Sequence, residues 1–210
     1  LWEQFCAASL REFDAIYDRM DVRFDVTLGE SAYRDDLQLL RVFDDAVFIA
    51  PEYTVRSDTL LRDRRLDYGE AFGNVRIMDP DGGSLVTGDH GLFAADGTWA
   101  RVDRNPALET REEGGEPVHS TARDMRFFRA EERVVMTDSV RIFQGPMRAF
   151  ADTAISFGRQ RMLLLGDPRL EQGERSRMYG DQIEFFYRDG NLYRVILLGN
   201  ARMEDSEPDS

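Results

Sequence analysis

Few residues of this chain have the types and spacing of a catalytic centre. The two histidines, His90 and His119, follow Asp89 and precede Ser120, so each forms an adjacent pair instead of joining a triad of separated residues. The nucleophile motif Gly-x-Ser-x-Gly is absent from the sequence. The sequence therefore predicts no catalytic residues, and we expect the protein not to be an enzyme.

Carboxylates are abundant, and several recur at one kind of position, where an Asp follows a small residue. This small-Asp phrase is found at Ser57-Asp58, Gly88-Asp89, Ala151-Asp152 and Gly180-Asp181, and at Ala122-Arg123 with Arg in place of Asp. Carboxylates could act as acid and base or bind Ca²⁺, but an Asp at such a fixed point is typical of a side chain that accepts from backbone donors of a turn. Residues 79–83 lack the remaining ligands of a calcium loop. We predict the turn role, no metal site and no cofactor.

The small-Asp phrase recurs about every thirty residues from Ser57 on, and that period indicates an array of similar supersecondary units. A second phrase, here called the turn phrase, lies between its copies and consists of a turn dipeptide followed by a short run. It begins at Gly73-Asn74, Arg104-Asn105, Asp138-Ser139, Gly166-Asp167 and Gly199-Asn200. In its first copy Val75 and Ile77 alternate with Arg76, as in a strand with one buried face.

Turn chemistry supports two strands in each unit. Asp96-Gly97 and Asp189-Gly190 lie between apolar runs, where Gly accepts the positive φ of a tight hairpin turn. The Asp of each small-Asp phrase lies an even number of residues from the apolar positions after it, so a straight strand would bury that Asp. We therefore predict a bend or bulge near each small residue. Pro106 and Pro168, which replace the Val of other turn phrases, indicate edge or bulged positions.

On these phrases, residues 43–204 resemble the OstA-like (organic solvent tolerance) domain of periplasmic and outer-membrane lipopolysaccharide-transport proteins. The resemblance implies a mainly β fold, a repeat-built antiparallel β-jellyroll or slab with a V-shaped section, whose apolar groove receives the acyl chains of lipopolysaccharide. It also implies a periplasmic location and neighbouring OstA-like subunits joined edge to edge. Under this interpretation the protein binds lipopolysaccharide or a related lipid and passes it along a bridge toward the outer membrane.

Apolar strand residues are the candidate ligand-binding positions. Each of them faces inward in the predicted strands, where it either lines an acyl-chain groove or fills a dry core, and the sequence leaves both alternatives open. The predicted lipid-binding residues are Val75, Ile77, Phe93, Met125, Phe127, Val140, Ile142, Ile183 and Phe185. If the core is dry, the protein is a β-solenoid scaffold without a lipid ligand.

Residues 1–40 differ in character from residues 41–210, and we divide the chain there. Trp2, Phe5, Phe13 and Ile16 fall at the spacing of an amphipathic helix, followed by a short strand. Residues 1–36 resemble an internal segment of arginyl-tRNA synthetase, which offers the alternative of a synthetase fragment. The His-x-Gly-His loop and the Lys-rich loop of that enzyme are absent, so the resemblance transfers no activity. The appendage is either native or a fused fragment.

Composition limits the partners of the protein. The net charge is −13, and all 27 basic residues are Arg, so we expect no nucleic acid as partner because phosphate backbones bind positive surfaces. Arg nevertheless suits bidentate contact with the phosphates of a lipid. No run of roughly 18 apolar residues and no signal peptide is present. Cys6, the single cysteine, excludes an internal disulfide.

Overall fold

The computed structural model describes residues 39–63, 65–111, 114–173 and 175–205, all of which belong to the unit Gln38–Ser210. The helix predicted within residues 1–40 lies outside the described residues. In the part that is described, the chain forms strands and turns without a helix, and hence without a helix that could cross a membrane. The predicted mainly β, antiparallel architecture is confirmed.

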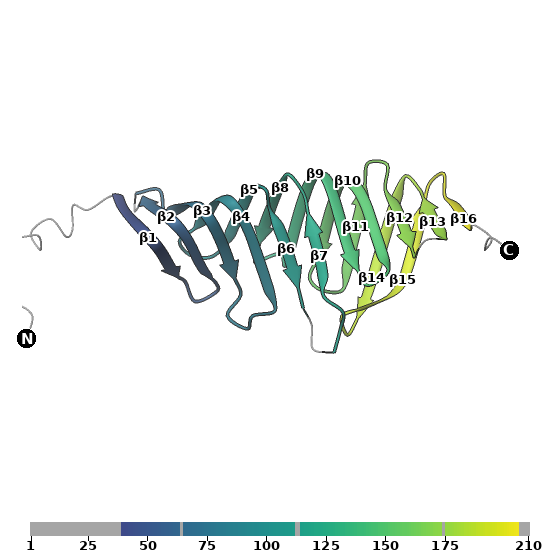
Figure 1. Cartoon of the computed structure of the whole chain (residues 1–210), viewed down its shortest axis with the longest axis horizontal. Helices are drawn as coiled ribbons and strands as arrows, with labels where there is room; N and C mark the ends of the chain where they lie inside the picture. Colours follow the sequence, from purple (N-terminus) through teal and green to yellow (C-terminus); the bar gives the residue numbers. More distant parts are fainter. Residues whose placement is uncertain (1–38, 64, 112–113, 174, 206–210) are drawn as a thin grey trace, which may run out of the picture. The chain divides into compact units, whose positions relative to one another are not determined.

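The strands follow one another across a 16-stranded sheet, coloured from purple at β1 to yellow at β16 in Figure 1, and every pairing is antiparallel. Their bounds are β1 Leu39–Ile49, β2 Thr54–Asp63, β3 Tyr68–Met78, β4 Ser84–Ala94, β5 Trp99–Arg104, β6 Ala107–Thr110, β7 Val118–Thr121, β8 Asp124–Phe128, β9 Arg133–Gln144, β10 Met147–Phe157, β11 Arg161–Leu165, β12 Arg169–Gln172, β13 Ser176–Tyr179, β14 Gln182–Arg188, β15 Asn191–Leu198 and β16 Arg202–Asp205. The predicted hairpin turns at Asp96-Gly97 and Asp189-Gly190 are confirmed, with φ of 80° at Gly97 and 72° at Gly190.

The sheet folds over into two layers because the chain bends each time it reaches one of the two phrases. In β4, residues His90–Phe93 pair with β5, whereas residues Ser84–Thr87 pair with β6. The first layer holds β6, β7, β12, β13 and β16, the second holds β5, β8, β11, β14 and β15, and the longer strands contribute one half to each. The predicted bulges are confirmed, for example by the register shift between Arg56 and Thr59 in β2.

Side-chain pairs join neighbouring strands at the bends. The Nδ2 of Asn74 donates to both carboxylate oxygens of Asp58 at 3.1 and 3.0 Å. Asn105 donates to one carboxylate oxygen of Asp89 at 2.6 Å, and Asn200 donates to both oxygens of Asp181 at 3.1 Å, so each amide pairs with the Asp of the preceding small-Asp phrase. The prediction that these Asp side chains accept from backbone donors is therefore wrong, since side-chain amides of the turn phrase are their partners. Asn suits this position because it tolerates the left-handed backbone that the bend requires, with φ of 47° at Asn74.

The two departures from the repeat have physical explanations at the same bends. At the bend with Arg123, the small-Asp phrase supplies the donor instead of the acceptor, because the Nη1 of Arg123 donates to Asp138 at 3.2 Å. Pro106 and Pro168 lie between strands, just after the bend, where no ladder hydrogen bond is lost. The small residue is needed for packing, since a Cβ at Gly88 would lie 2.9 Å from the carbonyl oxygen of Arg104 and would overlap Val102.

The core lies between the layers. Val75 and Ile77 are buried and Arg76 is exposed, as the alternation predicted. Side chains from both layers form one apolar cluster that includes Val86 of the first layer and Phe93 of the second. Burial of each large side chain contributes on the order of 1.5–3 kcal/mol, so this cluster holds the layers together.

Candidate functional site

A cavity of about 790 Å³ lies between the two layers near the turns that end their strands. Its walls are mainly apolar because the inward positions of the strands alternate with outward polar ones. Ile77, Val86 and Leu108 come from the first layer. Phe127 and Met136 come from the second, with Trp99, Ala100, Val134 and Met162. The arrangement can enclose an apolar ligand or the apolar part of an amphipathic one.

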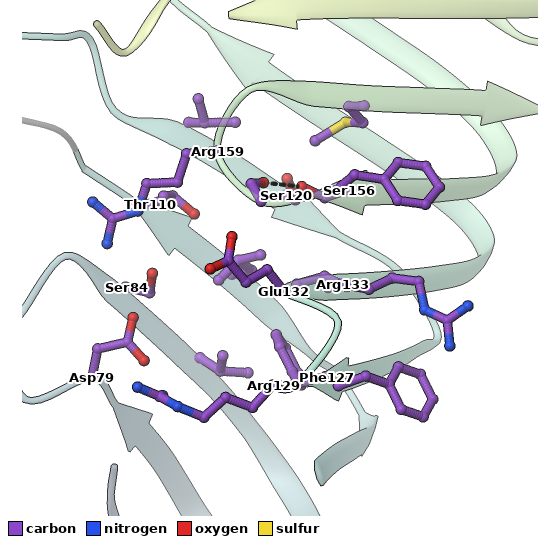
Figure 2. Close-up of a pocket in the computed structure, with 18 of the residues that line it drawn as sticks. Asp79, Ser84, Thr110, Ser120, Phe127, Arg129, Glu132, Arg133, Ser156 and Arg159 are labelled. Atoms are coloured by element: carbon purple, nitrogen blue, oxygen red, sulfur yellow. Dashed lines mark hydrogen bonds between the residues drawn. The ribbon is translucent and has the colours of Figure 1, made fainter. Parts of the chain in front are cut away.

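Charged and polar side chains line the mouth of the cavity, which we define as Asp79, Glu116, Arg129, Glu131, Glu132, Arg133, Arg159, Gln160 and Arg161. Figure 2 shows Arg129 and Arg159 pointing to the same side, whereas Arg133 points to the opposite one. Arg129 pairs with Glu52 at 2.6 Å, Arg133 pairs with Glu131 and Arg161 pairs with Glu184. Arg159 forms no ion pair with a carboxylate of the described residues. Its guanidinium lies close to Gly83 of the first layer, 2.9 Å from where a Cβ would stand.

One end of the cavity is closed by contacts around Tyr53. Its hydroxyl, in the first layer, donates to the carbonyl oxygen of Ala94 in the second. The Tyr53 ring also packs against the ring of Phe93. Phe93 in turn packs against Phe48, with 5.0 Å between the ring centroids. The Glu52–Arg129 ion pair joins the layers at the same end. The cavity therefore stops at this aromatic cluster.

At the other end, the turns that hold the lining residues Glu116 and Gly190 are joined by Gln144, a buried residue at the end of β9. Its Nε2 donates to the carbonyl oxygen of Glu116, in the turn before β7, at 3.2 Å and to that of Gly190, in the β14–β15 turn, at 2.7 Å. The two turns also touch directly, since a Cβ at Gly115 would lie 3.0 Å from the Cα of Gly190. We call these two hydrogen bonds the Gln144 bridge, because they connect the first layer to the second.

Hydroxyl groups supply the polar atoms inside the cavity. Ser84, Thr110, Ser120, Ser156 and Tyr187 belong to its lining, and Figure 2 shows the first four among the labelled residues. The Ser156 hydroxyl donates to the carbonyl oxygen of Gly158 at 2.8 Å. The Tyr187 hydroxyl is buried and has no hydrogen-bond partner among the described residues. Burial raises the pKa of both Tyr53 and Tyr187, so each stays a neutral hydrogen-bond donor.

The predicted ligand-binding residues all face the interior, but the structure places them in two groups. Ile77 and Phe127 line the cavity. The others lie in the closed core, where each is no more than 1% exposed: Val75, Phe93, Met125, Val140, Ile142, Ile183 and Phe185. The predicted lipid-binding set lacks four further residues of the lining, Val134, Met136, Met162 and Tyr187. Alternation marks the inward positions of a strand, but it does not show which of them border a cavity.

The histidines lie away from the cavity lining. The Nδ1 of His90 is 2.6 Å from Asp103 and its Nε2 is 2.9 Å from Glu70, so both ring nitrogens are engaged by carboxylates. Arg101, which pairs with Asp124, lies 3.5 Å from the second oxygen of Asp103 and extends this charged network. Across the described ranges, no group of three or more His, Cys, Asp or Glu side chains is arranged to hold a metal ion.

Comparisons with known proteins give short or distant matches. No family profile matches the chain. The arginine–tRNA ligase of Leuconostoc mesenteroides is 51% identical over 37 residues, and that of Fusobacterium nucleatum is 49% identical over 35 residues. These matches cover 18% and 17% of this chain but only 7% and 6% of the ligases. Among solved structures, LptH from Pseudomonas aeruginosa, described as the LptA-homologous periplasmic component of the lipopolysaccharide transport device, is 15% identical with a TM-score of 0.49. That match covers 53% of this chain and 80% of LptH.

Proposed function

We propose that this protein is a carrier, not an enzyme, which binds lipopolysaccharide or a related lipid and passes it along a periplasmic bridge toward the outer membrane. The observation that carries the proposal is the cavity with apolar walls and a charged mouth. Such a site matches an amphipathic molecule, whose acyl chains leave water while its head group stays at the surface. The OstA-like phrases of the sequence support lipopolysaccharide as the lipid and the periplasm as the compartment.

The size of the cavity limits how much of the lipid enters. A cavity of about 790 Å³ holds roughly 26 methylene-sized groups, if each takes about 30 Å³ as a water molecule does in the liquid. That amount corresponds to one or two acyl chains. Because Tyr53 and Gln144 close the two ends, further chains would need these contacts to open.

Arginines at the mouth are suited to the head group. Arg159 has no carboxylate partner among the described residues, and its planar guanidinium can bind a phosphate through two hydrogen bonds. Arg129, by contrast, is held by Glu52 through both an ion pair at 2.6 Å and a hydrogen bond to the carbonyl oxygen at 3.0 Å. We therefore assign the first phosphate contact to Arg159.

Transfer between subunits would use the two ends of the sheet. Strand β1 pairs only with β2 and strand β15 only with β14 among the described strands, so each leaves one edge open to another chain. Apolar side chains are exposed on both, with Phe43 and Ile49 on β1 and Tyr193 and Leu198 on β15. These edges support the proposal that neighbouring OstA-like subunits join edge to edge.

Photo-crosslinking tests the proposal directly. A photoreactive phenylalanine analogue at Phe127, which lines the cavity, is expected to capture lipopolysaccharide, whereas the same group at the exposed Arg76 or Arg141 is not. Crosslinkers at Ile142 and Phe185 report on the closed core, and strong capture there would mean that the layers separate on binding. Equal capture from inward and outward sites, or none with folded protein, contradicts lipid carriage and favours a dry scaffold.

A further inference from the structure

The strands of the two layers end in two sets of turns beside the cavity. We call the turns of the first layer, with the strand residues that flank them, the first lip; it comprises the described residues among 49–54, 78–84, 110–118, 144–147 and 172–176. The second lip is the corresponding part of the second layer, with the described residues among 63–68, 94–99, 128–133, 157–161 and 188–191. The two lips differ in the side chains that they expose.

Away from the terminal strands, large apolar side chains are exposed on the second lip. The described residues include eleven exposed large apolar side chains, and eight of these belong to the terminal strands β1, β15 and β16. The other three all lie in the second lip: Leu66 is 63% exposed, Trp99 37% and Phe157 39%. A localised apolar patch among polar residues is typical of a surface that contacts a partner or a membrane.

An alternating row of aromatic and arginine side chains supports this patch. Trp99 lies opposite Phe128 in the strand pairing, and Phe128 lies opposite Arg133. Phe157 follows, with Arg133 opposite it on one side and Arg161 on the other. The guanidinium carbon of Arg133 is 4.6 Å from the centroid of the Phe128 ring, and that of Arg161 is 5.4 Å from the centroid of the Phe157 ring. These contacts hold the side chains in place, so the row is a preformed surface.

The row runs along the mouth, because Trp99, Phe128, Arg133, Phe157 and Arg161 all border the cavity. Strands β5 and β10 are separated by β8 and β9 in the sheet, so Trp99 and Phe157 are three strand spacings apart, which is about 14 Å. They are therefore close enough to contact one continuous surface.

Charge also distinguishes the two lips. The described residues of the second lip include six Arg and six Asp or Glu, whereas those of the first include two Arg and four Asp or Glu. The second lip is thus balanced in charge, and its Arg133 pairs with Glu131 at 2.7 Å. The first lip is acidic, and its aromatic residue Tyr53 is buried. Lipid phosphates are therefore repelled by the first lip but not by the second.

We propose that the second lip docks on the surface of a phospholipid membrane. Leu66, Trp99 and Phe157 enter the membrane interface, where aromatic side chains are favoured, and the arginines of the row contact lipid phosphates. Because the chain has a net charge of −13, burial of these apolar side chains supplies the affinity, and we expect binding to neutral phospholipids. Docking itself requires no ligand in the cavity. Its consequence, that a lipid enters the mouth directly from the membrane, rests on the proposed function.

Flotation with vesicles of phosphatidylcholine and phosphatidylethanolamine tests the docking. The full chain is expected to float with the vesicles, and Phe157→Ser or Leu66→Ser is expected to weaken its partition about tenfold by removing a large inserted side chain. Met203→Ser is the matched control, because it removes an exposed apolar side chain of β16, and its partition is expected to stay unchanged. Thermal melts check that each variant folds, and Leu66 lies in a turn outside the strand packing. Absence of flotation, or flotation that Leu66→Ser and Phe157→Ser leave unchanged, overturns the proposal.

Tryptophan fluorescence tests which lip faces the membrane. In Trp2→Phe, Trp99 is the remaining tryptophan, and phosphatidylcholine with brominated acyl chains in the vesicles is expected to quench it. The control is Asp81→Trp combined with Trp2→Phe and Trp99→Phe, which places the tryptophan at an exposed position of the first lip, where no quenching is expected. Equal quenching at both lips overturns docking through the second lip.

Failure of the docking and failure of the proposed function give different results. Capture of lipopolysaccharide at Phe127 without flotation overturns the docking and leaves the carrier function in place. Flotation that is weakened in Phe157→Ser, without capture at Phe127, supports the docking and overturns the carrier function.

Discussion

The Gln144 bridge is expected to stabilise the fold by an amount that can be estimated from its two hydrogen bonds. Gln144→Leu keeps most of the side-chain volume but removes both hydrogen bonds, at 3.2 Å to Glu116 and 2.7 Å to Gly190. A hydrogen bond contributes about 0.5–1.5 kcal/mol net, and the exposed Glu116 turn can replace its donor with water, so we expect a loss of about 1–2 kcal/mol. For a chain of this size that loss lowers the melting temperature by about 2 to 8 °C.

Thermal and urea unfolding, followed by circular dichroism, measure this loss. Gln144→Glu is the matched control, because it has nearly the same shape but presents a carboxylate to the same two carbonyl oxygens. Burial beside these oxygens raises the folded-state pKa of the introduced carboxyl. Its destabilisation is therefore largest above that pKa and is relieved as the pH falls toward the unfolded value of about 4.3.

Three results would refute the reasoning. If Gln144→Leu has the same melting temperature as the unsubstituted protein, the bridge does not hold the layers together. If Gln144→Glu shows no relief at low pH, the side chain is not buried against the two carbonyl oxygens. If Gln144→Leu is less stable but binds lipid with unchanged capacity, the bridge does not form the end wall of the cavity.

Deleting residues 1–40 is expected to leave the β sheet folded, because stacked units depend mainly on their neighbours; loss of the β spectrum or of a cooperative melt contradicts this. No ATP–pyrophosphate exchange with arginine is expected, since the sequence lacks the His-x-Gly-His loop, and exchange above background would overturn that prediction. Arg123→Asp should lower the melting temperature by placing a carboxylate beside Asp138, and adding Asp138→Asn should restore it by replacing the repelling carboxylate with an amide that can donate to the new Asp. A double variant no more stable than the single one argues against the pairing. Hydrogen bonds from Thr98 hold the pKa of Asp96 below its usual value, so the stability that Asp96 contributes is present above about pH 4 and is lost as the pH falls through the lowered pKa. Urea unfolding from pH 6 to pH 2 should therefore show a weaker acid dependence for Asp96→Asn than for the unsubstituted protein.

Local chemistry made much of the fold predictable. Gly97 and Gly190 mark hairpin turns because their positive φ follows from the turn itself, without reference to distant residues. The bend at each small-Asp phrase was predictable from parity, since a straight strand would have buried Asp58 with Leu60. Repetition of these signals then indicated strands arranged in series.

The hydrogen-bond partners of side chains on neighbouring strands could not be predicted from the sequence. Asp58 and Asn74 are both conspicuous in the repeat, but their hydrogen bond depends on the register of β2 against β3. The sequence suggested backbone donors for Asp58 because turns usually provide them locally. The bulge turns the side chain outward, and the amide of the next strand is then the donor within reach.

The sequence alone determined which side chains face inward, because alternation in a strand is a local property, and it predicted the interior positions of Ile77, Phe127 and Val75 alike. Only the tertiary structure decided which of these border a cavity. Long-range contacts join the layers, through the Tyr53 hydroxyl at one end and the Gln144 bridge at the other. Ile77 and Phe127 lie where the layers stand apart, whereas Val75 lies where they close, and no property of a single strand encodes that difference.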